Sequence, residues 1–252
     1  MNKGNNKKNG NRKPKYQEEE SPRDSQQFKS SLDIIIGEIN VKPKTENQKK
    51  FIKLINEKEI IICSGNAGTG KTFLAVSEAL KLLKDNNSPY KKIVLLKSVT
   101  QLKDESLGFL KGDLEMKLSP FMYSFMANFY KILGNKISDQ LKEQGFIEVL
   151  PIAFIRGLSI DNSIVIVDES QNISLDNMES ILTRIGSNSK MIIIGDTKQI
   201  DIKNKKESSL YIINEKFKNI KEFGVMSFEK SDQVRNPLIN KIEDAFNEIK
   251  MM

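Results

Sequence analysis

The sequence contains no histidine, no tryptophan and only one cysteine, Cys63. Without histidine, the chain has no His-based catalytic triad, no His general base and no His metal ligand. Acid–base chemistry therefore falls to Asp, Glu, Lys or Tyr. A single cysteine forms no internal disulfide and builds no zinc site alone. Because Cys63 ends the apolar run Ile60-Ile61-Ile62-Cys63, we expect a small buried hydrophobe rather than a reactive thiol.

Long apolar segments are also missing. No apolar run approaches the roughly 18 residues that a membrane-spanning helix needs. The basic residues near the N-terminus are not followed by the apolar segment of a signal peptide. We therefore expect no membrane segment and a cytoplasmic location.

The positive charge of the chain is concentrated at its N-terminus. The formal net charge is +7 over 252 residues. Residues 1–16 hold six basic side chains and no acidic one, whereas the remainder holds 34 basic and 33 acidic side chains. Residues 1–30 are polar with almost no large apolar side chains, which predicts a disordered basic tail. Such an arm can contact RNA or DNA phosphates, or it can simply solubilise the protein.

The rest of the chain, residues 31–252, alternates between short β-branched runs and helical patterns. This alternation predicts one α/β domain with a mostly parallel sheet. Most of the strand runs are apolar nearly throughout, as strands covered on both faces should be. Strands are expected at 59–64, 92–97, 146–150, 163–167, 190–195 and 224–228. Helices are expected at 71–84, 120–133, 175–185, 208–216 and 237–249, with residues 99–145 forming an inserted helical or loop region.

A phosphate-binding motif follows the first strand. It reads Gly65-Asn66-Ala67-Gly68-Thr69-Gly70-Lys71-Thr72 and fits the P-loop pattern G-x-x-x-x-G-K-[ST]. Its glycines let the backbone N–H groups curl around an anion, and the helix that follows adds the positive end of its dipole. Lys71 should reach the β- and γ-phosphates of ATP, and the Thr72 hydroxyl should ligate Mg²⁺.

Two carboxylates follow a second apolar strand. The run Ser163-Ile164-Val165-Ile166-Val167 ends in Asp168 and Glu169. In a chain that already has a P-loop, this pair predicts a hydrolytic site. We expect Asp168 to hold Mg²⁺ directly or through water, and Glu169 to orient and deprotonate the attacking water.

A third apolar strand, residues 190–195, is followed by Asp196-Thr197-Lys198-Gln199. The amide of Gln199 is a candidate hydrogen-bond partner for the γ-phosphate or the attacking water. A polar loop with no such role is the alternative interpretation.

Taken together, these segments resemble the PhoH-like family of P-loop ATPases. The resemblance covers about residues 44 to 246. It runs through Thr45-Glu46-Asn47-Gln48, the P-loop, Leu107 to Asp113, Ile155-Arg156-Gly157, Val167 to Asn172, Leu182 to Gly186, Gly195-Asp196 with Gln199 to Asp201, and Asp232-Gln233-Val234-Arg235. The sequence departs from the family pattern at Lys97-Ser98, at Ser170 and at Ser209.

The resemblance implies a single RecA-like core that binds and hydrolyses ATP, with a link to RNA metabolism. It implies that Gln48, placed ahead of the P-loop, reads adenine. Helicases of the resembled superfamily place ATP between two such cores, whereas this chain has room for one. An arginine that stabilises the transition state must then come from the same chain or from a neighbour, and we expect a homo-oligomeric ring. Candidate arginines are Arg184, Arg235 and Arg156, with ordinary surface roles as the alternative.

The sequence is compatible with three functions. The first is an RNA-coupled ATPase or helicase-like motor. The second is an ATP-gated binding module that serves a nuclease or ribosome partner with little turnover. The third is a small-molecule kinase, which the paired carboxylates and the absence of an Arg-rich lid disfavour. The sequence does not separate the first from the second.

Overall fold

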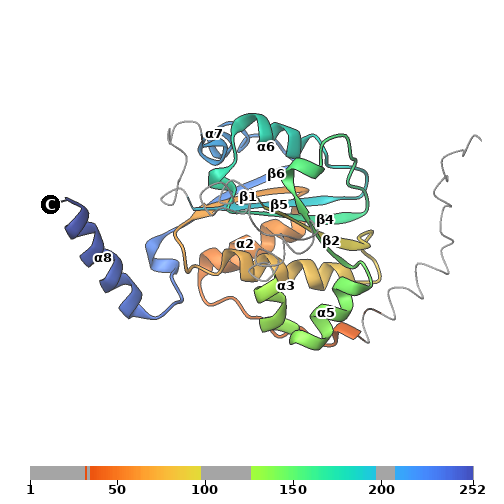
Figure 1. Ribbon diagram of the computed structural model, residues 1–252, viewed down its shortest axis with the longest axis horizontal. Helices are drawn as coiled ribbons and strands as arrows, with labels where there is room; N and C mark the ends of the chain where they lie inside the picture. The colour runs from red at the N-terminus through yellow and green to blue at the C-terminus, as the bar shows by residue number, and fades with distance from the viewer. Residues whose placement is uncertain (1–31, 33–34, 98–125, 197–207, 252) are drawn as a thin grey trace, which may run out of the picture.

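The computed structural model describes residues 32, 35–97, 126–196 and 208–251. A sheet of six strands forms its centre (Figure 1). The strands are β1 (Ile60–Gly65), β2 (Lys92–Lys97), β3 (Ile147–Pro151), β4 (Ser163–Asp168), β5 (Lys190–Gly195) and β6 (Phe223–Phe228). Their order is β3-β2-β4-β5-β1-β6, and every neighbouring pair is parallel. The predicted α/β core with a mostly parallel sheet is therefore confirmed.

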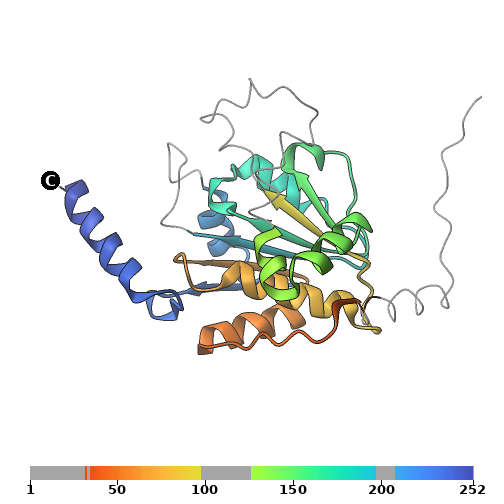
Figure 2. The same cartoon turned by 60° about the horizontal axis from the view of Figure 1, so that its bottom comes forward.

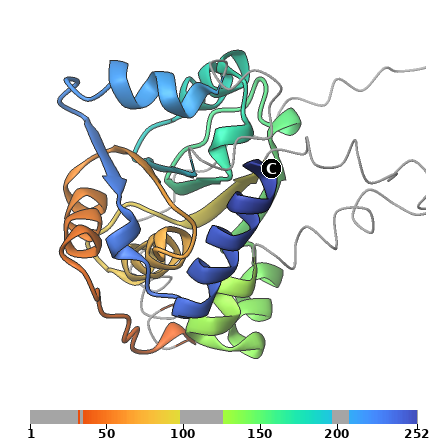
Figure 3. The ribbon, with the colours of Figure 1, turned by 90° about the vertical axis from the view of Figure 1, so that its left-hand side faces the viewer.

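Helices cover both faces of the sheet (Figures 1 and 2). One face carries α2 (Glu46–Glu57), α3 (Lys71–Lys84) and α5 (Asn135–Glu143), together with the helical residues 126–133. The other face carries α6 (Leu175–Leu182) and α7 (Ser209–Lys216). The last helix, α8 (Pro237–Met251), leaves the layers, and Figure 3 views the molecule from the side on which it lies.

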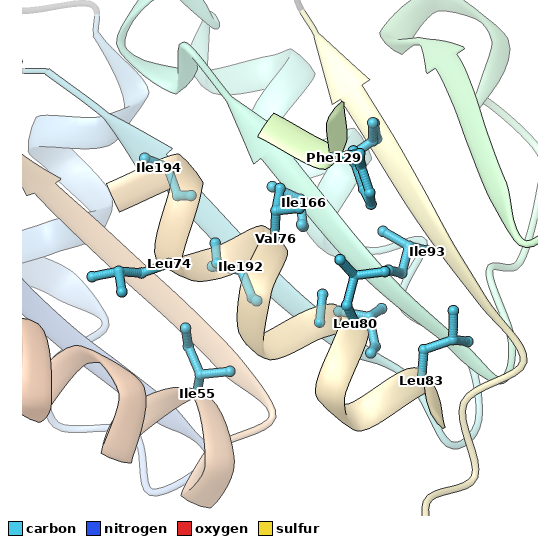
Figure 4. Packing of buried hydrophobic residues seen from close by; sticks show 14 of the residues in the cluster. Ile55, Leu74, Val76, Leu80, Leu83, Ile93, Phe129, Ile166, Ile192 and Ile194 are labelled. Atoms are coloured by element: carbon cyan, nitrogen blue, oxygen red, sulfur yellow. The ribbon is translucent and has the colours of Figure 1, made fainter. Parts of the chain in front are cut away.

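Alternating strand residues build two separate cores, as the two-residue period of a strand requires. The core under α2 and α3 takes Ile61, Cys63, Ile93, Leu95, Ile164, Ile166, Ile192 and Ile194. The core under α6 and α7 takes Ile60, Ile62, Val94, Leu96, Val165, Val167, Met191 and Ile193. Figure 4 shows α3 packed onto the first core through Leu74, Val76, Leu80 and Leu83. Because each fully buried aliphatic side chain contributes about 1.5–3 kcal/mol, α3 is firmly fixed beneath the sheet.

The predicted elements agree with the structure to within about two residues at most ends. One helix was predicted too long: α6 ends at Leu182 rather than at 185. There the chain turns, and Ile185 pairs with Ile160 while the Arg184 carbonyl accepts from the Ile160 N–H at 2.9 Å. The described part of the inserted region, from residue 126 to 145, is largely helical.

The helix α2 was not predicted from the sequence. Its sequence is mostly polar, and its buried side chains are only Gln48, Phe51 and Ile55. These lie three and four residues apart and so share one helix face. The Thr45 side chain caps the helix by accepting from the Gln48 N–H at 3.2 Å.

Some predictions fall on parts of the chain that the structure does not describe. The predicted tail, residues 1–30, and Gln199 lie outside the described residues. In the described ranges, no helix has the combination of length and hydrophobicity needed to cross a membrane. Cys63 is fully buried, and this burial raises the pKa of its thiol far above the ordinary value. The expectation of a small buried hydrophobe is confirmed.

Candidate nucleotide-binding site

Three adjacent strands bring the candidate residues to one edge of the sheet. β5 lies between β1, which leads into the P-loop at residues 65–72, and β4, which ends at Asp168. Because all three strands are parallel, their carboxyl ends meet at the same edge. In doubly wound sheets, ligands bind outside such carboxyl ends. The P-loop and the two carboxylates, far apart in the sequence, are thus neighbours in the fold.

The P-loop curls tightly at two glycines. Gly65 has φ of 138°, and a Cβ there would lie 2.6 Å from the Phe228 carbonyl oxygen. Gly68 has φ of 77°, and a Cβ there would lie 2.4 Å from Cδ of Arg235. The helix that follows, α3, begins at Lys71 without any side-chain cap on its first N–H groups. Uncapped N–H groups at a helix N-terminus, next to a curled loop, fit a phosphate.

Lys71 points back into the loop that precedes it. Its Nζ donates to the carbonyl oxygens of Gly65 and Asn66, both at 2.8 Å, and the residue is only 8% exposed. Burial lowers the pKa of Lys71, while the negative charges of Asp196, Asp168 and Glu169 act in the opposite direction. An ammonium held in the curve of an anion-binding loop is placed where it meets the phosphates of a nucleotide.

Thr72 and Asp168 form the part of the site that fits Mg²⁺. The Thr72 Oγ1 donates to Asp168 Oδ1 at 3.2 Å, although the two residues are 96 positions apart. The same Asp168 oxygen accepts the Glu169 N–H at 3.0 Å. Mg²⁺ is commonly bound by one or two protein oxygens together with phosphates and water. This hydroxyl–carboxylate pair next to a P-loop fits that description.

Glu169 occupies a left-handed backbone conformation, with φ of 53° and ψ of 36°. Its Oε2 accepts from Gln171 Nε2 at 2.6 Å. A non-glycine residue in this conformation costs about 1–3 kcal/mol and persists where the surrounding structure enforces it. The position and the strain both fit a carboxylate held for a functional purpose.

A second segment supports the P-loop from outside. Val234 N–H donates to the Gly68 carbonyl at 3.0 Å, and Gln233 Nε2 donates to the Ala67 carbonyl at 3.2 Å. The side chain of Arg235 packs against Gly68. We call residues 232–235 the P-loop strap. It connects the loop directly to α8, which begins two residues later.

The strap is itself anchored to α2. Asp232 accepts from Asn47 Nδ2 at 2.7 Å and from the Glu229 N–H at 2.9 Å. Burial of Asp232 opposes its charge, but these hydrogen bonds outweigh burial and lower its pKa. The strap therefore ties the P-loop, α2 and the start of α8 together.

Gln48 lies directly against the P-loop and is 3% exposed. Its Nε2 donates to the Thr69 carbonyl at 2.9 Å, and its Oε1 accepts from the Lys44 N–H at 2.6 Å. Gln48 thus supports the loop from the α2 side. Its predicted role in reading adenine stays a prediction.

The three candidate arginines lie in different places. Arg235 belongs to the strap and lies at the P-loop of its own chain. Arg156 is exposed and donates to Asn177 Oδ1 at 3.5 Å, near the start of α6. Arg184 follows the end of α6 and bonds through its carbonyl to Ile160, which precedes β4. Since β4 runs from that end towards Asp168, Arg184 lies at the edge of the sheet opposite to its own P-loop.

The sequence pointed to the P-loop, Asp168 and Glu169, and the structure brings these together. It did not assign roles to Gln171, Asn47, Asp232 or Gln233. The only sequence signal for them was that each falls within a segment shared with the resembled family. Besides local contacts with Glu169 and Glu229, these residues make contacts that join distant parts of the sequence, and no local pattern reveals those.

The family model described as PhoH-like protein matches residues 40–247. A PhoH-like protein of Bacillus subtilis (strain 168) is 38% identical over 82% of this chain and 64% of its own length. A PhoH-like protein of Synechocystis sp. is 37% identical over 83% of this chain and 63% of its own length. Protein PhoH of Escherichia coli (strain K12) is 32% identical over 81% of this chain and 57% of its own length. The chain thus spans less than two thirds of the length of these relatives.

Among solved structures, the chain is similar to the large terminase from a thermophilic bacteriophage. The TM-score is 0.44 with 12% identity, over 80% of this chain and 50% of the terminase chain.

Proposed function

The chain belongs to the PhoH-like protein family, and from its site geometry we propose that it binds ATP with Mg²⁺ and hydrolyses it. One observation supports this proposal above the others. Lys71 in the P-loop, the Thr72–Asp168 pair and Glu169 all lie at the carboxyl ends of three adjacent parallel strands. A P-loop alone holds phosphates, whereas a carboxylate beside it supplies a base for an attacking water.

Each residue has a distinct part in the proposed reaction. The loop N–H groups and the start of α3 hold the phosphates, and the Lys71 ammonium stabilises negative charge on them. The Glu169 carboxylate orients a water molecule and accepts its proton. Thr72 and Asp168 would hold Mg²⁺, which neutralises phosphate charge when it is bound. Gln199 remains a proposed γ-phosphate contact, outside the described residues.

We further propose that the ATPase is coupled to RNA. Support comes from the family resemblance in the sequence and from the six basic side chains within residues 1–16. The described domain itself gives no base-reading motif that would establish unwinding. The alternative, an ATP-gated binding module, is supported by the strap, which links the P-loop to α8. That helix exposes Leu238, Ile242, Phe246 and Ile249 on its surface.

The test is the steady-state rate of ATP hydrolysis by the full chain with and without single-stranded RNA. An RNA-coupled ATPase is expected to turn over faster with RNA, and the effect should weaken as salt rises because phosphate contacts release counterions. A variant lacking residues 1–30 separates a contribution of the tail from one of the domain. Turnover that does not change with RNA at any salt concentration refutes the coupling and leaves ATP hydrolysis standing.

We also propose that the chain forms a head-to-tail ring in which Arg184 acts on a neighbouring copy. Its position at the far edge of the sheet excludes its own P-loop, so only a head-to-tail arrangement would bring it to an ATP site. Arg184→Ala is then expected to lower turnover by about 10³-fold or more, as for a lost arginine finger. Mixing this variant with Lys71→Ala should restore part of the activity, because some interfaces combine an intact loop with an intact arginine. Arg156→Ala tests another candidate in the same way, and it should leave turnover unchanged if Arg184 is the finger. No recovery in the mixture, or a monomer with full activity, would rule the proposal out.

A further inference from the structure

Gln171 is a buried polar residue to which the proposed reaction gives no role. It lies in the 3-10 helix Ser170–Asn172, which begins one residue after Glu169 at the end of β4, and it is 1% exposed. Its side-chain Nε2 donates to Glu169 Oε2 at 2.6 Å. Its side-chain Oε1 accepts the backbone N–H of Asp196 at 2.9 Å. One amide group therefore joins the carboxylate at the end of β4 to the end of the neighbouring strand, β5.

The Asp196 contact fixes which way the amide faces. A carboxamide has a donor end and an acceptor end. The Asp196 N–H requires the acceptor end, so the donor end must face Glu169. Turning the amide around would bring two donors together at Asp196 and two oxygens together at Glu169. The hydrogen-bond network thus determines the orientation.

The glycine at position 195 leaves room for the Gln171 side chain, and a further hydrogen bond holds the Gln171 backbone. A Cβ at Gly195 would lie 2.8 Å from Gln171 Oε1, so a residue with a side chain there would push the amide away. The backbone carbonyl of Gln171 accepts from Ser208 Oγ at 3.0 Å. Both ends of the side chain and its own backbone are engaged. Gln171 therefore acts on the site through Glu169 rather than by touching a nucleotide.

We propose that Gln171 is a positioning residue that holds the Glu169 carboxylate for water activation and ties it to the end of β5. Glu169 has a strained left-handed backbone conformation, and its side chain needs a partner to keep one orientation. The Gln171 N–H supplies that partner through a charge-assisted hydrogen bond. This inference rests on the proposed hydrolytic function of Glu169.

The test is a double-mutant cycle between Gln171 and Glu169. Gln171→Met keeps the volume of the side chain and removes both hydrogen bonds. We expect kcat for ATP to fall about tenfold to a hundredfold while KM changes by less than about twofold, because a misplaced base slows the chemical step. In the Glu169→Gln background, the same substitution should change the residual rate by less than about twofold. An equal slowing in both backgrounds, or a raised KM with unchanged kcat, would overturn the proposal.

Different results would refute the positioning role of Gln171 and the proposed hydrolytic function. If the unaltered protein shows no turnover, the hydrolytic function fails, and the positioning role fails with it. If the unaltered protein turns over and Glu169→Gln abolishes this turnover, but Gln171→Met does not slow it, only the positioning role is wrong. Unfolding in urea for each folded variant shows whether a lost rate merely follows lost stability.

Discussion

Glu169→Gln is expected to lower the turnover of ATP by about 10²–10⁴-fold while nucleotide affinity stays within about threefold of the unaltered protein. The substitution keeps the shape of the side chain and removes its capacity to accept a proton. Glu169 lies beside the P-loop rather than in it, so the contacts that hold phosphates stay in place. Binding of a fluorescent ATP analogue and release of phosphate measure the two quantities separately.

The control is Glu179→Gln, the same change at an exposed carboxylate on α6. It should leave both turnover and binding unchanged. If Glu169→Gln hydrolyses ATP at nearly the rate of the unaltered protein, then Glu169 is not the base. If it loses binding together with turnover, its role is in holding the nucleotide instead.

Lys71→Ala is expected to weaken ATP binding by about 10²-fold and to remove measurable turnover. Hydrogen bonds from a charged donor contribute about 1.5–3 kcal/mol each, and about 1.4 kcal/mol corresponds to tenfold in affinity. Because the ammonium is held by the carbonyls of Gly65 and Asn66 within the loop, its loss also removes the cation around which the loop curls. Isothermal titration with ATP and Mg²⁺ measures the change.

The matched control for this lysine is Lys53→Ala. Lys53 lies on α2 and forms an exposed pair with Glu57 at 3.8 Å, a kind of pair that contributes little. The Lys53→Ala variant should bind ATP as tightly as the unaltered protein. A Lys71→Ala variant with unchanged affinity would mean that the loop does not bind phosphates in the way proposed.

The parts of this site that lie in consecutive residues could be predicted from the sequence, whereas contacts between distant residues could not. The P-loop and the Asp168–Glu169 pair were found from the sequence because each consists of consecutive residues of characteristic type that follow an apolar strand. The link between Asn47 and Asp232 joins positions 185 residues apart, and no local pattern predicts it. The same holds for the contact of Gln171 with Asp196, which depends on β5 lying next to β4.

Strand order and the positions of the arginines needed the structure for the same reason. The sequence identified three central strands but not that β5 separates β1 from β4. It placed Arg184 in a helix, whereas α6 ends before that residue. Arg184 therefore lies at the edge of the sheet opposite to the P-loop. It passed over α2 because that helix buries only one narrow stripe of side chains. Segments with strong apolar periodicity were located well, and polar segments that fold onto the core were not.

We propose that the P-loop and Glu169 form one site that hydrolyses ATP. The most direct test is phosphate release from ATP by the full chain, measured with and without Mg²⁺ beside the Lys71→Ala and Glu169→Gln variants. We expect saturable, Mg²⁺-dependent turnover that both variants lose and that Glu179→Gln keeps. ATP binding without phosphate release above the level of Glu169→Gln would contradict it.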